Sequence, residues 1–316
     1  MNIIIGKKSL RSRNLILLIK LVFVPAAFGW LLTQYIDYKQ VFLLSFDSWL
    51  LLAALLVNFL ALLLFATRMR IILDVFDAKI SLFQAFRIHL QSMFYFFILP
   101  MTVGLEAARF AKVKKIIDRP LNEITLGSAL LFDRFIGAGT ALFLSLLLFP
   151  FLNFKMKIEW NAWLLLGIFI LALGFIWLLF LHSKIRYYIK KIFMLCHLGQ
   201  KGLLFATEVS IVTHIFYAFS LYLAAKSVHL DISFLQTLFA LTAAMLCLIF
   251  PISLAGASPV EAATLGVLLA LKIPMDQALI FVLLSYLAKF MAALLGGIWE
   301  FYEDSEAVFR RLLAKR

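Results

Sequence analysis

Long apolar segments decide what kind of fold this chain can adopt. Runs of about 18 or more predominantly apolar residues recur from Leu15 to Trp299. Of the 316 residues, 64% are hydrophobic and only 15% are charged, whereas soluble domains have about a quarter charged residues. The alternating pattern that the strands of a membrane barrel need does not occur in the sequence. The sequence therefore predicts an all-α polytopic membrane protein.

Six segments have the length and composition of full membrane spans. They are residues 15–36, 47–67, 123–149, 160–182, 203–225 and 276–299. No linker or low-complexity run separates them, so we expect a single integral membrane domain over residues 1–316.

Two further apolar segments are interrupted by proline and glycine. The first contains Pro100 and Gly104, and the second contains Pro251 and Gly256. Paired interruptions of this kind in two halves of a chain are typical of the discontinuous helices of transporters. We therefore interpret both segments as re-entrant broken-helix hairpins. The hairpins would cover residues 82–117 and 233–272, inside repeat halves of roughly 82–150 and 233–300.

The distribution of Lys and Arg favours this interpretation over the alternative, in which 82–99 and 233–250 cross the membrane fully. With re-entrant hairpins and a cytoplasmic N-terminus, most of the 30 Lys and Arg residues lie on the cytoplasmic side. A full crossing by 82–99 would instead export the basic clusters at 109–119 and 184–201, against the positive-inside rule. The two halves then have inverted topology, and the C-terminus is also cytoplasmic. In this topology, the Lys and Arg residues on the outer side of the membrane are Lys39, Lys155, Lys157, Lys226 and Lys272.

Three charged residues lie near the middle of predicted spans. Asp133 and Arg134 lie about 15 Å into the span that begins near Glu123, and Lys289 lies near the middle of the last span. Each costs about 2.5–3.5 kcal/mol on insertion scales, so each needs a partner or a function. Neighbours on a helix point in different directions, so Asp133 and Arg134 reach different partners or Arg134 faces a cavity. A role in binding phosphate or in gating and a role as helix-joining ion pairs, such as Lys289 with Glu261 or Asp133, both stay open.

The second interruption also carries a helix-start signal. The sequence Ser258-Pro259-Val260-Glu261 fits a capping box, so we predict that a half-helix begins at Ser258. Its free N–H groups would favour an anion such as phosphate. The first interruption is a weaker copy, with Glu106 and Arg109 in the returning helix. Whether Glu261 only caps its own helix or also contributes to a site stays open.

Sequence signatures of enzymes are missing. No His-Glu-x-x-His zinc motif, Gly-x-Ser-x-Gly elbow or phosphate-binding loop occurs. Cys196 and Cys247 lie in different segments without metal-ligand spacing to a histidine. We therefore expect no catalytic residue, no metal and no cofactor. The net charge of +13 follows the positive-inside pattern, so we expect no nucleic-acid partner.

The following motifs occur in this order along the chain: Leu99-Pro100, Gly104-Leu105-Glu106-Ala107-Ala108-Arg109, Asp133-Arg134-Phe135-Ile136-Gly137, Pro251-Ile252-Ser253, Gly256, Val260-Glu261 and Gly296-Gly297. Together they resemble the lysylphosphatidylglycerol synthase transmembrane-region family, and the resemblance covers nearly the whole chain. Three departures from the family pattern are Leu105 for a second glycine, Glu106 for aspartate and Val260 for arginine. The last removes a positive charge, so the head group is expected to differ from that of aminoacylated lipids.

This resemblance implies a stand-alone lipid flippase of the bacterial inner (cytoplasmic) membrane that carries a phosphate-bearing lipid. The family's soluble aminoacyl-transferase domain is not among these residues, so translocation rather than synthesis is expected. The alternatives are the membrane subunit of a lipid- or envelope-modifying enzyme and a structural scaffold. A homo-oligomer or a soluble enzyme partner stays open. The substrate-binding candidates are Arg134, Lys289, Asp133, Glu106, Arg109, Glu261 and Ser258; Glu208 and His214 are weaker ones.

Overall fold

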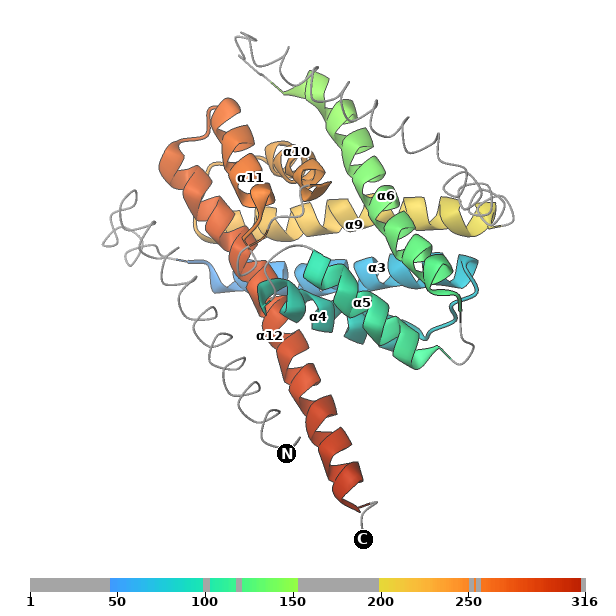
Figure 1. Cartoon of the computed structure of the whole chain (residues 1–316). Coiled ribbons are helices and arrows are strands. Elements are labelled where there is room, and N and C mark those ends of the chain that lie inside the picture. Colours follow the sequence, from blue (N-terminus) through green and yellow to red (C-terminus); the bar gives the residue numbers. More distant parts are fainter. Residues whose placement is uncertain are drawn as a thin grey trace.

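A computed structural model describes residues 46–98, 103–117, 121–152, 199–249, 253 and 257–313. The regular elements in these ranges are eight α-helices and two short 3-10 helices (Figure 1). Four helices are long and apolar enough to cross a membrane, which confirms four of the predicted spans and a multi-pass membrane protein. The predicted spans at 15–36 and 160–182 lie outside the described residues. The four helices are α3 (Ser48–Val75), α6 (Glu123–Leu148), α9 (Gln200–Ser227) and α12 (Met275–Leu313).

The observed end of α3 corrects the predicted end of the second span. α3 continues to Val75, past the predicted end at residue 67, so Arg68 and Arg70 are helical and do not lie in a loop. Arg68 is buried, because it finds a carboxylate partner inside the protein. The apolar run Ile71-Ile72-Leu73 then continues the helix. From sequence alone, the two arginines looked like the end of the span.

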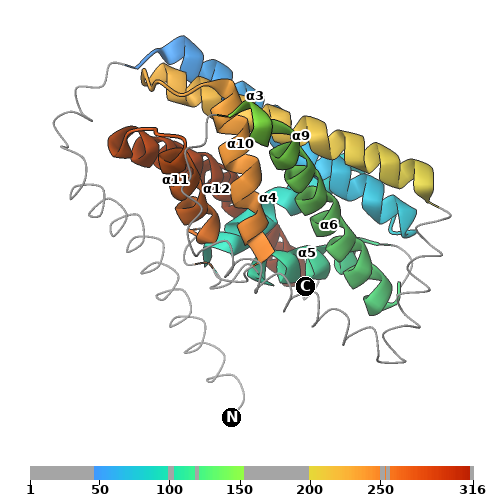
Figure 2. The same ribbon diagram turned by 90° about the horizontal axis from the view of Figure 1, so that it is seen from above.

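α3 and α9 lie side by side and antiparallel in both views (Figures 1 and 2). At one end the N–H of Asp47, the N-cap of α3, donates to the carbonyl oxygen of Ser227 at 2.8 Å. At the other end Gly202 lies against Val75, and a Cβ on this glycine would come within 2.6 Å of Val75 Cγ2. The two helices therefore lie against each other along their whole length.

Four shorter helices occupy the two interrupted segments. α4 (Leu82–Ile98) packs against α5 (Val103–Ile116), and α10 (Phe234–Met245) packs against α11 (Pro259–Ala270). The 3-10 helix η2 (Leu246–Ile249) extends α10, and η1 (Phe149–Phe151) extends α6. The turns at residues 99–102, 250–252 and 254–256 lie outside the described residues. At about 1.5 Å per residue α5 is about 21 Å long and α11 about 18 Å, less than a hydrocarbon core of about 30 Å.

The two hairpins open toward opposite ends of α12. Beside the open end of the α4–α5 hairpin, Arg87 and Lys112 form ion pairs of 2.8 Å with Glu303 and 2.6 Å with Glu300. Beside the open end of the α10–α11 hairpin, the Asp231 N–H donates to Gln277 Oε1 at 3.2 Å. Gln277 is in the first turn of α12, whereas Glu300 and Glu303 follow more than 20 residues later.

The closed ends of the two hairpins meet beside the middle of α12. Phe96 and Phe97, near the end of α4, pack with Tyr286 of α12. Leu105, at the start of α5, and Ala257, just before α11, pack against the same cluster. The two interruptions that the sequence pairs are therefore close together in space.

Candidate functional site

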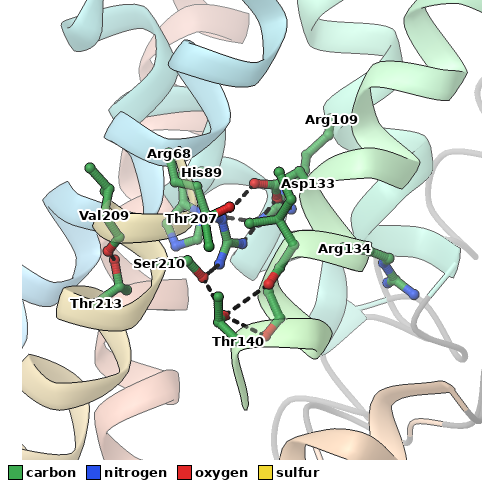
Figure 3. Close-up of polar contacts among 12 residues, drawn as sticks. Arg68, His89, Arg109, Asp133, Arg134, Thr140, Thr207, Val209, Ser210 and Thr213 are labelled. Carbon is green, nitrogen blue, oxygen red and sulfur yellow. Dashed lines mark hydrogen bonds and ion pairs between the residues drawn. The ribbon is translucent and has the colours of Figure 1, made fainter. Parts of the chain in front are cut away.

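Asp133 is the centre of a buried ion network. Arg68 on α3 donates to it twice, from Nε to Oδ1 at 2.8 Å and from Nη2 to Oδ2 at 3.2 Å (Figure 3). Arg109 on α5 donates from Nη1 to Oδ2 at 3.4 Å. The side chain of Asp133 is only 3% exposed. One carboxylate thus joins α3, α5 and α6, as the helix-joining interpretation expects.

The network continues to α9 through uncharged groups. Arg68 Nη1 donates to Ser210 Oγ at 3.0 Å, and Ser210 Oγ lies 2.7 Å from Thr140 Oγ1. His214 Nε2 lies 3.1 Å from Thr140 Oγ1 and 3.0 Å from the carbonyl oxygen of Gly137. His214 is therefore a buried hydrogen-bonding residue of the helix interface. Glu208, the other weaker candidate, is exposed.

Arg109 is also held entirely by the protein. Its Nη2 lies 2.9 Å from His89 Nδ1, its Nε lies 3.4 Å from Ser92 Oγ, and its Nη1 lies 3.4 Å from Glu106 Oε1. The residue is 7% exposed. These contacts, together with that to Asp133, place Arg109 in the framework around the site.

Arg134 extends away from Asp133, toward α5 (Figure 3). Its Nε donates to Glu106 Oε1 at 2.8 Å, and its side chain is 34% exposed. The expectation that Asp133 and Arg134 reach different neighbours is confirmed. Of the two cations that contact Glu106, Arg134 is the one an external ligand reaches more easily.

A second ion pair lies at the start of α11. Lys289 on α12 contacts Glu261 Oε1, and both side chains are largely buried. Glu261 Oε2 accepts hydrogen bonds from the Ser258 N–H at 2.7 Å and from Ser258 Oγ at 2.9 Å. The predicted helix start at Ser258 is confirmed, with a capping box. Glu261 therefore caps its helix and also pairs with Lys289, whereas a role of Glu261 in substrate binding stays a prediction.

The sequence interpretation missed Arg68, His89 and Ser210. Arg68 lies just past residue 67, the predicted end of its span, and the other two are ordinary polar residues within apolar helices. The signal that could have found Arg68 is the apolar run that follows it, because a cation followed by more helix needs a buried partner. That Arg134 faces a cavity stays a prediction, because the turns at residues 99–102 and 250–252 lie outside the described residues.

The site offers cations, carboxylates and hydroxyl groups. Within the described ranges, no three or more His, Cys, Asp or Glu side chains are grouped to hold a metal ion. Arg134 pairs with Glu106, and Lys289 pairs with Glu261. Such cations can bind a phosphate group if the carboxylate gives way.

One comparison with known proteins is informative. The family model for the lysylphosphatidylglycerol synthase TM region matches residues 17–297. That range includes both hairpins, the ion network around Asp133 and the ion pair of Glu261 with Lys289. No curated protein and no solved structure gives a significant match.

Proposed function

The chain belongs to the lysylphosphatidylglycerol synthase transmembrane-region family, whose membrane domains are associated with lipid modification or flipping, and from this premise we propose that it moves a phosphate-bearing lipid across the bacterial cytoplasmic membrane. It does so without catalysing a reaction, and both termini lie in the cytoplasm. The observation that carries the proposal is a pair of matched glutamate–cation contacts beside the two broken hairpins.

The two contacts correspond in position. Glu106 is in the first turn of α5 and Glu261 in the first turn of α11, the returning helices of the two hairpins. Each pairs with a cation on the long helix that follows, Arg134 on α6 and Lys289 on α12. The separation along the chain is 28 residues in both cases.

Further correspondences support an inverted repeat. α3 and α9 are both 28 residues long and antiparallel. Each is followed by a residue in the left-handed region, Asp77 at φ 61° and His229 at φ 59°. Each hairpin then begins with the same reciprocal serine–glutamine cap. The caps are Ser81 with Gln84 and Ser233 with Gln236.

The arrangement of the hairpins supports entry from opposite membrane faces. Their open ends lie near opposite ends of α12, and their closed ends pack around Phe97 and Tyr286. α5 and α11 are too short to cross the hydrocarbon core. Discontinuous helices of this kind bind substrates near the midplane in many transporters.

A lipid phosphate would bind by exchange with the carboxylates. When a buried ion pair loses one partner, the unpaired charge costs about 3–5 kcal/mol, so a displaced glutamate needs a second partner. Glu106 has one in Arg109, at 3.4 Å. Glu261 has one in the N–H and hydroxyl groups of Ser258. Arg134 and Lys289 can therefore turn to a phosphate without leaving either carboxylate isolated.

Arg134 is the cation on which the proposal depends most. Its planar guanidinium donates two parallel hydrogen bonds to a phosphate, and its exposure makes it accessible. Proteoliposomes with a fluorescent phospholipid, quenched from outside, measure movement between leaflets. We expect wild-type protein to accelerate movement, Arg134→Ala to slow it at least about tenfold and Arg134→Lys to slow it less. Normal insertion of Arg134→Ala with wild-type movement would contradict the proposal.

The family name favours a second candidate, the membrane part of a lipid-modifying enzyme made with a separate soluble partner. The same lipid-binding residues would then present a head group to that partner. Affinity purification from the native membrane separates the candidates. A stoichiometric soluble enzyme, together with no lipid movement by the purified chain alone, supports the second.

A further inference from the structure

A pocket lies at the open end of the α10–α11 hairpin, away from the ion network around Asp133 and from the Glu261–Lys289 pair. Its volume is about 520 Å³, within the range of about 300–1,000 Å³ typical of small-ligand sites. Its walls come from the end of α9, the start of α10, the turn between α11 and α12, and the start of α12. The lining residues include Tyr222, Lys226, Asp231, Ser233, Lys272 and Gln277.

We propose that this pocket binds the phosphodiester of a lipid head group at the outer membrane surface. Positive-inside counting leaves only five of the 30 Lys and Arg residues on that side, and two of them, Lys226 and Lys272, line this one pocket. Asp231 offsets one of the two ammonium charges. The lining then has one net positive charge, which suits the single negative charge of a phosphodiester better than a polyanion.

The ammonium group of Lys226 is held in place before any ligand binds. Its Nζ donates to the carbonyl oxygen of Leu230 at 3.2 Å and lies 5.8 Å from the ring centroid of Tyr222. A cation–π contact of this kind restricts the side chain without neutralising its charge. An ammonium has three N–H donors, so a further acceptor can bind.

Lys272 reaches the pocket from a conformation that favours glycine. It follows α11 at φ 62°, and its N–H donates to the carbonyl oxygen of Leu269 at 2.9 Å. Glycine is the usual residue at this position after a helix, because a side chain there is strained. Lys272→Gly therefore removes the ammonium group while relieving strain, so it tests the charge without endangering the fold.

Two helix starts add to the attraction. Ser233 is the N-cap of α10, and Pro274 precedes the first turn of α12 at the pocket wall. Positive partial charge at helix N-termini favours an anion. The turn between α9 and α10 is held to α12 by the hydrogen bond from the Asp231 N–H to Gln277 Oε1. As a head-group site at the mouth of the second hairpin, the pocket deepens the proposed lipid-moving function and rests on it.

The test is a binding measurement on the purified full chain in detergent. The probes are a short-chain phosphatidylglycerol, the matching diacylglycerol and inorganic phosphate. We expect the phosphatidylglycerol to bind at least about tenfold more weakly to Lys226→Gln/Lys272→Gly than to wild type. The single variant Lys272→Gly is expected to fall between them. Lys201→Gln, an exposed lysine at the other end of α9, is the matched control and should bind as wild type.

Each outcome decides the matter. Equal binding of phosphatidylglycerol to wild type and the double variant overturns the proposal, as does equal binding of diacylglycerol and phosphatidylglycerol. Inorganic phosphate that displaces the lipid at equal concentration would identify free phosphate as the ligand and overturn the head-group assignment. Lysine-dependent binding by a chain that moves no lipid would leave the pocket standing and refute the proposed function. If lipid movement depends on Arg134 but binding does not depend on Lys226 and Lys272, the proposed function stands and the proposed pocket is refuted.

Discussion

Arg68 donates to both carboxylate oxygens of Asp133, at 2.8 Å and 3.2 Å, and so joins α3 to α6 inside the protein. Both side chains are less than 10% exposed. Arg134, next to Asp133 in sequence, is far more accessible and pairs with Glu106 instead. Asp133 therefore holds α3 and α6 together, whereas the side chain of Arg134 is exposed enough for a ligand to reach.

Removal of Asp133 should destabilise the protein strongly. Asp133→Ala leaves Arg68 without a carboxylate and takes one of two from Arg109. An uncompensated buried charge costs about 3–5 kcal/mol, so we expect a large fall in the unfolding temperature of the purified protein in detergent. Glu208→Gln, an exposed charge on α9, is the control and should change the temperature little.

A double-mutant cycle tests whether that loss comes from the ion pair. Arg68→Met/Asp133→Leu removes both charges and keeps apolar volume. We expect it to be more stable than either single variant, with a coupling energy of about 1–3 kcal/mol. Additive losses would show that Arg68 and Asp133 stabilise the fold independently.

The limits of the sequence interpretation can be traced to particular residues. Periodicity and length located α6, α9 and α12 near their starts, because apolar runs define where a helix can meet lipid. The cap at Ser258 was also predictable, since it depends on residues next to each other. The partners of Asp133 were not, because Arg68 and Arg109 lie on other helices. Only the three-dimensional packing shows which cation meets which carboxylate.

Gly137 should tolerate no large side chain. A Cβ there would lie 3.0 Å from Arg68 Nη1, and that guanidinium is fixed by Asp133 and Ser210. We expect Gly137→Leu to lower the stability by about 1–3 kcal/mol by overpacking. Gly139, two residues later, has nothing within 4 Å of a Cβ. Gly139→Leu should therefore unfold near the wild-type temperature, and equal losses at both positions would contradict this account.

Gly296 should be equally sensitive for a different reason. A Cβ at Gly296 would overlap the carbonyl oxygen of Leu90, so α4 and α12 must separate to accept Gly296→Ala. Backbone cannot rotate aside as a side chain can, and we expect a loss of at least about 1–3 kcal/mol. Gly266→Ala is the matched control, because a Cβ at Gly266 on α11 meets nothing within 4 Å. Thermal unfolding of the two variants side by side measures the difference.

Lys289 should have a role beyond folding. Lys289→Met removes the cation that pairs with Glu261, and Lys289→Met/Glu261→Gln removes the leftover charge as well. We expect the double variant to recover much of the stability that the single variant loses. It should still move lipid at least about tenfold more slowly than wild type, because no ammonium remains to bind phosphate. Wild-type movement by the double variant would show that Lys289 serves packing alone.

The central claim is that the two hairpins enter the membrane from opposite faces, and cysteine labelling tests it most directly. Lys114→Cys marks the open end of the α4–α5 hairpin and Asp276→Cys the start of α12, each with Cys196 and Cys247 replaced by serine. We predict that a membrane-impermeant maleimide labels position 276 in intact cells and position 114 only after the membrane is opened. Labelling of both positions from the same side would contradict the account.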